Sequence, residues 1–317
     1  MSSSDGRVVY VLLPGQGTRL ASDAAAPLTS SRVASCALDE LKVDITRLTA
    51  AQLAQSTYYG QLALGVRLLD LLDRLRREQG ELLTGSEATY FAGFSLGEVP
   101  ALAGAGRLSL RDTLKVLKAR AEAMQKACEA RPGSMVTLLG VQDETKIEQQ
   151  NGVSIAIRLF PGCRVAAGPA EAMRGVKWVP EIAEKAQSRE ELVGAFHTEL
   201  MQDGAEAIRQ LKGKVKPAKG RKNVDVFSNA TGMLYTEEDD VLNTLAKQVE
   251  CTVQWETILQ TIVDDERPKV IIDLGSKGQF RAMLRRMVPS VSKRGQETAE
   301  DAEPAESGEQ IEIVEFN

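Results

Sequence analysis

The chain has 317 residues, of which 43% are hydrophobic and 4% aromatic, which is enough for one large core or two smaller ones. No apolar stretch approaches the roughly 20 residues that span a bilayer, and none of the four cysteines forms a Cys-x-x-Cys pair. These features argue against a membrane protein, a zinc site and a disulfide framework, and we expect no nucleic-acid or membrane partner. The formal net charge of the whole chain is −5.

The first five residues, Met1 to Asp5, have neither the positive charge nor the apolar run of a secretory signal. We expect a cytoplasmic protein, or a mitochondrial or plastid one if a transit peptide has been omitted from the sequence. The cysteines are then expected to be reduced and mostly structural.

The first predicted element is a buried strand. Residues 8–13 form a continuous apolar run of strand length, as expected for a parallel strand covered on both faces. The run ends at residues 14–17, Pro-Gly-Gln-Gly, which lack the glycine spacing of nucleotide-binding loops. From Ala21 to Gly80 the pattern is helical, and aliphatic residues between 62 and 72 predict one well-buried helix.

The second predicted strand leads into a Gly-x-Ser-x-Gly motif. Gly93, Ser95 and Gly97 follow the pattern of a nucleophile elbow, in which a tight turn holds a serine hydroxyl at the head of a helix. The glycines leave room for the turn, and Ser95 would be the nucleophile. Because the motif is short, a strand-to-helix turn capped by a serine is an open alternative.

A long amphipathic helix is predicted next, with residues 109–112 as its cap. Leu117, Ala121 and Met124 mark its apolar side and place Arg120 on or beside that side. Arginine is seldom buried without a partner, so Arg120 either pairs with an internal carboxylate, binds an anionic ligand or extends its head group to water.

The middle of the chain has a different character. Residues 135–141, 153–159 and 164–167 are predicted as short strands separated by polar segments, which indicates a small sheet of its own. The next segment holds His197, the only histidine in the chain. If Ser95 is a nucleophile, His197 is the sole imidazole that could act as its base, although a packed or surface histidine fits the sequence as well.

The last folded third returns to the pattern of the first. Residues 224–227 and 270–274 are predicted as further core strands. The carboxyl ends of parallel strands meet at one edge of a sheet, so Gln16, Ser95 and Asn229 are expected to lie together where ligands bind.

The end of the chain is acidic. Residues 295–317 contain eight acidic residues and no basic one, which leaves residues 1–294 with a net charge of +3. This composition cannot bury much surface, so we expect residues 295–317 to be disordered, with only 311–316 able to dock or pair as a strand.

Six segments in chain order resemble malonyl-CoA:acyl carrier protein transacylases and the acyltransferase domains of fatty acid and polyketide synthases, over about residues 8–287. The segments are Pro14 to Gly17, Gly93 to Glu98, Arg120 with Met124 and Gln125, Ala195 to His197 with Leu200 and Met201, Ser228 to Gly232, and Gln248 ahead of Val253 to Trp255. No segment is decisive alone, but six at compatible spacing make chance agreement very improbable.

The resemblance implies a hydrolase-like α/β body with a parallel sheet and a nucleophile elbow, interrupted by a small ferredoxin-like α+β subdomain. We assign residues 1–127 and 199–294 to the body, residues 128–198 to the subdomain, and residues 295–317 to the acidic tail. The active site would lie in the cleft between body and subdomain.

Carried over residue by residue, the resemblance implies a serine nucleophile with an imidazole base. Ser95 would be acylated, and His197 would take its proton. Gln248 would orient His197 through its main-chain carbonyl, where a triad would have a carboxylate.

The resemblance also implies how the acyl group is held. The backbone N–H groups of Gln16 and Leu96 would form the oxyanion hole, and Arg120 would hold a malonyl carboxylate. The Ala-Phe-His form of residues 195–197 is similar to malonyl-selective members of the family.

The implied activity is transfer of a malonyl group from malonyl-CoA to the phosphopantetheine thiol of an acyl carrier protein, in fatty acid or polyketide synthesis. The thioester and the carrier protein would be substrates, no cofactor or metal would be needed, and the enzyme would be a monomer.

Two other functions stay open. An esterase or thioesterase would use the same elbow, with a carboxylate orienting His197. A non-catalytic relative is suggested by two departures from the family pattern: Phe94 replaces a histidine, and Pro100 should distort the second helical turn after Ser95.

Overall fold

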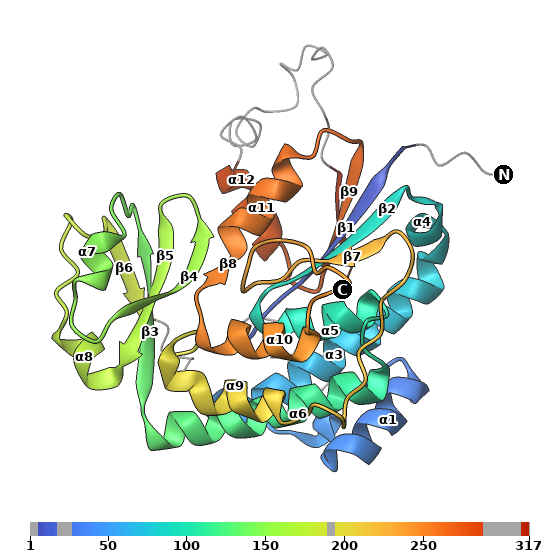
Figure 1. Ribbon diagram of the computed structural model, residues 1–317, viewed down its shortest axis with the longest axis horizontal. Helices are drawn as coiled ribbons and strands as arrows, with labels where there is room; N and C mark the ends of the chain where they lie inside the picture. The colour runs from blue at the N-terminus through green and yellow to red at the C-terminus, as the bar shows by residue number, and fades with distance from the viewer. Residues whose placement is uncertain (1–5, 18–26, 189–193, 288–311, 317) are drawn as a thin grey trace.

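The computed structural model describes residues 6–17, 27–188, 194–287 and 312–316 (Figure 1). The strands are β1 (Val8–Leu13), β2 (Ala88–Gly93), β3 (Gly133–Leu139), β4 (Ser154–Phe160), β5 (Cys163–Pro169), β6 (Lys185–Ser188), β7 (Val224–Val226), β8 (Val253–Gln254), β9 (Lys269–Leu274) and β10 (Glu312–Phe316). The α-helices are α1 (Ser31–Leu41), α2 (Ala50–Gln55), α3 (Thr57–Glu78), α4 (Gly80–Gly85), α5 (Glu98–Gly104), α6 (Leu110–Ala130), α7 (Thr145–Glu148), α8 (Ala170–Gly175), α9 (Gln202–Arg209), α10 (Val241–Glu250), α11 (Trp255–Asp264) and α12 (Gln279–Met287).

The larger sheet is parallel throughout, in the order β10-β9-β1-β2-β7. All residues of β1 are buried, as its continuous apolar sequence predicts for a central parallel strand. Leu13 of β1 pairs with Gly93 of β2, and Leu12 pairs with Asp273 of β9, so the carboxyl ends of these strands meet at one edge. The parallel sheet expected from the sequence is confirmed.

Helices cover the larger sheet, and α3 buries 15 of its 22 residues. It packs against α5 and α6, and Figure 1 shows it between the sheet and α1. Besides its aliphatic residues it buries Gln61 and Asp70, and the Asp70 carboxylate accepts hydrogen bonds from the main-chain N–H groups of Thr29 and Ser30. Within the described part of the chain, no helix is both long enough and apolar enough to cross a membrane.

The smaller sheet has the order β6-β3-β5-β4-β8. The segment β3-α7-β4-β5-α8-β6 has the connectivity and strand order of a ferredoxin-like fold, with antiparallel pairs. It has its own apolar cluster, in which Leu138 packs with Ile147 of α7 and Met173 of α8. The ferredoxin-like subdomain is confirmed, while the chain boundaries at residues 128 and 198 stay a prediction.

The smaller sheet also borrows a strand from outside this segment. Val253 of β8 pairs in parallel with Ile157 of β4, so a short strand that follows α10 extends the sheet. Helices α11 and α12 lie between the two sheets in Figure 1. The smaller sheet is therefore joined by main-chain pairing to a segment that lies outside residues 133–188 of the chain.

The sequence predicts that residues 295–317 are disordered, except that 311–316 could pair as a strand, and within that exception Glu312–Phe316 form β10 at the edge of the larger sheet beside β9. The sequence indicates which residues of the tail can pair but does not reveal the partner, because β9 lies far away in the sequence. The rest of the tail, apart from these residues, lies outside the described part of the chain.

Two arginines hold β10 in place. Arg281 of α12 donates a hydrogen bond to the main-chain oxygen of Ile313 at 3.1 Å and lies 3.6 Å from the Glu315 carboxylate. The guanidinium of Arg74 lies 4.4 Å from the ring centroid of Phe316, which is only 8% exposed. The strand is thus fixed by charge at one residue and by aromatic burial at another.

Replacing Phe316 with alanine is expected to lower the free energy of unfolding by about 2 to 3 kcal/mol, because it removes a buried ring and a cation–π contact. Urea denaturation of the full chain measures this. Val314→Ala is the control in the same strand, since Val314 is 38% exposed, and its effect should stay below about 1 kcal/mol. Equal stability of Phe316→Ala and wild type would mean that β10 does not dock.

Candidate functional site

Ser95 lies in a strained turn at the carboxyl end of β2. Its φ angle is 52°, a left-handed conformation that is costly for a residue with a side chain. A Cβ atom at Gly93 would come within 2.1 Å of the Gly97 carbonyl, and one at Gly97 within 2.5 Å of the Leu13 carbonyl oxygen. Both glycines are needed because the main chains touch there, as the sequence predicts for a nucleophile elbow.

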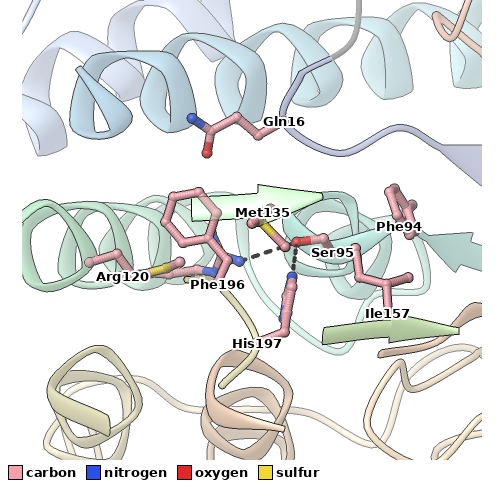
Figure 2. A pocket seen from close by; sticks show the side chains of 9 residues that line it. Gln16, Phe94, Ser95, Arg120, Met135, Ile157, Phe196 and His197 are labelled. Carbon is pink, nitrogen blue, oxygen red and sulfur yellow. Dashed lines mark hydrogen bonds between the residues drawn. The ribbon is translucent and has the colours of Figure 1, made fainter. Parts of the chain in front are cut away.

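Ser95 and His197 are in hydrogen-bond contact. Ser95 Oγ lies 2.8 Å from His197 Nε2 (Figure 2). On the other side of the ring, His197 Nδ1 lies 2.8 Å from the main-chain oxygen of Gln248. A carbonyl oxygen only accepts hydrogen bonds, so Nδ1 carries the hydrogen and Nε2 is free to accept from the Ser95 hydroxyl. The sequence-predicted residues Ser95, His197 and Gln248 therefore come together.

The environment of His197 keeps its ring neutral. The side chain is 3% exposed, and its burial lowers the pKa to about 4; the hydrogen bond to Gln248 opposes this shift and the charge of Arg120 adds to it. Its φ angle is 62°, a second left-handed residue in the site. At neutral pH the imidazole is in the form that accepts a proton.

Arg120 points from α6 toward Ser95. It is 2% exposed; Nη1 donates to Gln61 Oε1, and Nη2 lies 3.5 Å from Ser95 Oγ. Burial lowers its pKa to about 10, although the charge of Glu98 opposes the shift. Among the described residues no carboxylate lies within ion-pair distance of Arg120. Of the three possibilities left open by the sequence, the geometry leaves the guanidinium available to an anion beside Ser95.

A narrow cavity of about 20 Å³ lies over Ser95. Its lining residues come from the smaller sheet, from α6 and from the turns and loops beside them; they are Gln16, Phe94, Ser95, Arg120, Met124, Met135, Ile157, Phe196 and His197 (Figure 2). Met135 belongs to β3 and Ile157 to β4, so the smaller sheet closes the cavity from one side. Within the described residues, no group of three or more metal-binding side chains is present.

The two residues predicted for the oxyanion hole lie at neighbouring strand ends. Gln16 follows β1 and lines the cavity, on the opposite side of Ser95 from His197 in Figure 2. Leu96 is fully buried in the 3-10 turn Ser95–Gly97. Their convergence on one oxygen atom stays a prediction.

Asn229 is a site residue to which sequence reasoning gave no role. Its Oδ1 accepts a hydrogen bond from the main-chain N–H of Ser95 at 2.7 Å, and its Nδ2 donates to the main-chain oxygen of Gly93 at 2.7 Å. The signal was available, because an asparagine directly after a predicted parallel strand lies at the edge where the elbow lies. Gln61 was missed as well, although a polar residue on a buried helix face is itself a signal.

Glu98 is the other residue that was missed. It begins α5 and has no exposed surface. Its burial raises the pKa of the carboxyl group to about 7, while the hydrogen bonds donated by Tyr235, Asn229 and Gln248 act in the opposite direction. A glutamate after the elbow looks like a solvent-facing helix residue in sequence. Its three donors come from distant parts of the chain, which is why the sequence did not reveal them.

The two departures from the family pattern are accommodated. The Phe94 ring packs edge-on against Trp255 with centroids 5.0 Å apart. Pro100 is the third residue of α5, where its missing N–H falls among the first amides of a helix, which have no helical acceptor. The distortion expected in the second helical turn is thus replaced by a 3-10 turn at Ser95–Gly97 from which a new α-helix starts.

A family model described as an acyl transferase domain matches residues 10–308. A probable mitochondrial malonyl-CoA-acyl carrier protein transacylase of Drosophila melanogaster is 31% identical over 278 residues, which cover 80% of this chain and 72% of that protein. The human mitochondrial malonyl-CoA-acyl carrier protein transacylase is 29% identical over 308 residues, covering 88% of this chain and 77% of that protein.

Solved structures share the fold. MCAT from Mycobacterium tuberculosis matches with a TM-score of 0.78 at 23% identity, covering 97% of this chain and 96% of that one. In the complex PlMCAT:AntF, a type II PKS acyl-carrier protein with its malonyl-transacylase, the matching chain has a TM-score of 0.72 at 22% identity, with 89% of this chain and 93% of that one covered.

The lowered pKa of His197 predicts how the reactivity of Ser95 depends on pH. A fluorophosphonate probe reports it: the Ser95 oxygen bonds to phosphorus, fluoride leaves, and the hydroxyl proton passes to His197 Nε2. The imidazole becomes protonated only at about pH 4 and below. The labelling rate should therefore stay constant from pH 7 to about pH 5 and fall at lower pH. A half-maximal rate at pH 6.5, with the fold intact by circular dichroism, would contradict this; Ser95→Ala, which takes no label, is the control.

Proposed function

The chain belongs to the acyl transferase family, and from this premise we propose that it moves a malonyl group from malonyl-CoA to the phosphopantetheine thiol of an acyl carrier protein, through an ester on Ser95. The observation that carries the malonyl part is Arg120, a buried guanidinium 3.5 Å from Ser95 Oγ. The carrier protein as acceptor is supported by the names of the fly and human relatives.

In the first half-reaction the Ser95 oxygen attacks the thioester carbonyl while its proton passes to His197 Nε2. The Gln248 carbonyl holds the hydrogen on Nδ1 and stabilises the imidazolium that forms. The tetrahedral intermediate then collapses, the bond to sulfur breaks, and the imidazolium returns the proton to the leaving coenzyme A thiolate. Malonyl-Ser95 remains.

In the second half-reaction the carrier's phosphopantetheine thiol gives its proton to His197 and attacks the ester. The bond to Ser95 Oγ breaks, and the serine oxygen takes the proton back. The thioester is already an activated acyl group, so this route requires no cofactor and no metal.

Two groups stabilise charge along this route. The backbone N–H groups of Gln16 and Leu96 would receive the oxyanion in each half-reaction, as fixed donors in a site with little water. Arg120 would pair with the malonyl carboxylate, and its contact with Gln61 holds the guanidinium toward the cavity.

Transfer fits the site better than hydrolysis. A carboxylate orienting His197 would favour an esterase, but the partner of Nδ1 is the Gln248 carbonyl. A cation in the acyl cavity is of no use to an enzyme that cleaves neutral esters. The hydrogen bond between Ser95 and His197 argues equally against a non-catalytic role.

We further propose a monomer with body 1–127 and 199–294 and subdomain 128–198, acting in fatty acid or polyketide synthesis. The proposed compartment is the cytoplasm. The mitochondrion is the alternative, because the fly and human relatives are named mitochondrial.

Radiolabelled malonyl-CoA tests the seryl ester directly. Label should appear on Ser95 before any carrier is present and move to an acyl carrier protein when one is added. Ser95→Ala and His197→Ala should each lose several orders of magnitude in rate, and the double variant should be little worse, because the two residues act as a unit. Wild-type labelling of Ser95→Ala would refute the mechanism.

Arg120→Ala should reverse the acyl selectivity. A hydrogen bond to a charged group contributes about 1.5 to 3 kcal/mol, so losing one or two should lower kcat/KM for malonyl-CoA roughly 10-fold to 1,000-fold or more relative to acetyl-CoA. Arg120→Lys should recover only part, since lysine cannot form the bidentate pair. Arg67→Ala, at a buried arginine whose Nη1 donates to the main-chain oxygen of Pro27, is the matched control and should leave the ratio unchanged. A ratio unmoved by Arg120→Ala would place carboxylate recognition elsewhere.

A further inference from the structure

The proposed mechanism assigns no role to the Glu98 carboxylate, which lies at the centre of a buried polar network beneath Ser95. Its Oε2 accepts hydrogen bonds from the main-chain N–H of Asn229 at 3.0 Å and from Gln248 Nε2 at 3.3 Å. Its Oε1 accepts from the Tyr235 hydroxyl at 2.6 Å. Three donors from separate segments thus converge on one carboxylate.

The residues bound by Glu98 are the ones that hold the reactive pair. Asn229 Oδ1 accepts from the Ser95 N–H at 2.7 Å, while Gln248 Nε2 donates to the Ser95 main-chain oxygen at 2.6 Å. The Gln248 main-chain oxygen in turn accepts from His197 Nδ1 at 2.8 Å. The peptide groups on both sides of Ser95 and the ring of His197 are therefore tied to the partners of one side chain.

This support matters because the two supported residues are strained. Ser95 and His197 have φ angles of 52° and 62°, and a residue with a side chain keeps such a conformation only when its surroundings enforce it. Displacement of a reacting group by about 1 Å can reduce the rate on the order of 100-fold.

We propose that Glu98 is a positioning residue, whose carboxylate orients Asn229 and Gln248 so that the Ser95 hydroxyl faces His197 Nε2. Glu98 touches neither substrate nor the reacting atoms. The inference deepens the proposed function and rests on it only for the choice of acyl substrate.

The network requires an acceptor at Oε2 more than it requires a charge. The titratable groups that act on Glu98 are Arg120 on α6 and Tyr235. The Tyr235 hydroxyl can reverse from donor to acceptor. A glutamine could therefore place its oxygen at the Oε2 position and its NH₂ toward Tyr235 and keep every contact. An aspartate keeps the charge but is one methylene shorter, so it cannot reach all three donors.

The test is the rate at which a fluorophosphonate labels Ser95 in the full-length Glu98→Gln and Glu98→Asp variants. The glutamine variant should stay within about fivefold of wild type, and the aspartate variant should be slower on the order of 100-fold. With malonyl-CoA, the aspartate variant should lose kcat while KM is unchanged. A residue that only stabilises the fold would not produce this order of rates.

Asp70 provides the matched control, since it is a buried carboxylate that accepts from the main-chain N–H groups of Thr29 and Ser30 and contacts no residue of this network. Asp70→Asn and Asp70→Glu should leave the labelling rate unchanged.

The opposite order of rates, with Glu98→Asp faster than Glu98→Gln, would overturn the proposal. If the aspartate variant does not fold, a loss of more than tenfold in Glu98→Gln alone would also overturn it, because charge would then be the deciding property. Wild-type protein that reacts with the fluorophosphonate but accepts no malonyl group would refute the proposed function and leave the result on Glu98 standing.

Discussion

The contact between main chains at the carboxyl end of β2 determines the rest of the site. The turn at Ser95 is so tight that a Cβ atom at Gly93 would meet the Gly97 carbonyl, and it packs so closely on the end of β1 that a Cβ atom at Gly97 would meet the Leu13 carbonyl. The parallel pairing of β1 with β2 brings Leu13 opposite Gly93 and sets this distance. Because the turn cannot relax into an ordinary helix start, the serine hydroxyl is held above the sheet edge.

A strained turn of this kind needs support, and polar side chains supply it from the interior. Asn229 and Gln248 occupy the N–H and C=O groups of Ser95, so its main chain is satisfied although it belongs to neither a strand nor an α-helix. Both residues follow or lie in elements that pack on the same sheet edge. The support is therefore a consequence of the fold.

The charges buried around Ser95 are matched to different tasks. Arg120 and Glu98 are both nearly inaccessible to water and partly compensate one another's desolvation at a distance, since each shifts the other's pKa toward the charged form. Arg120 and Glu98 do not form an ion pair with each other, and the guanidinium therefore keeps donors for an anion. If a protein carboxylate already paired with Arg120, the N–H donors of the guanidinium would not be available to bind the carboxylate of a substrate.

Much of this arrangement could be predicted from the sequence. Continuous apolar strands and the Gly-x-Ser-x-Gly turn indicate a parallel sheet with an elbow, and a lone histidine leaves one candidate for the base. Glu98 and Gln61 were missed, and Asn229 was expected at the sheet edge but was given no role. All three are ordinary polar residues whose importance lies in partners 59 to 150 positions away. No periodicity encodes such contacts. The same limit applies in part to β10, because the sequence marks residues 311–316 as able to pair as a strand but does not identify β9 as the partner.

One short stretch of chain, residues 248–255, contacts both sides of the cavity over Ser95. Gln248 lies in α10 and binds the elbow, and five residues later Val253 pairs with Ile157 in the smaller sheet. The residue after Val253 is tied to the elbow support as well, because the main-chain N–H of Gln254 donates to the main-chain oxygen of Asn229 at 2.8 Å.

The next residue in this stretch, Trp255, packs its ring edge-on against Phe94, directly before the nucleophile. One continuous segment thus contacts the turn, its polar support and the strand that carries a wall of the cavity. Any shift of the smaller sheet that widens the cavity must pull on the residues that align Ser95 with His197. Access for the acyl group and alignment of the reactive pair are for this reason mechanically coupled.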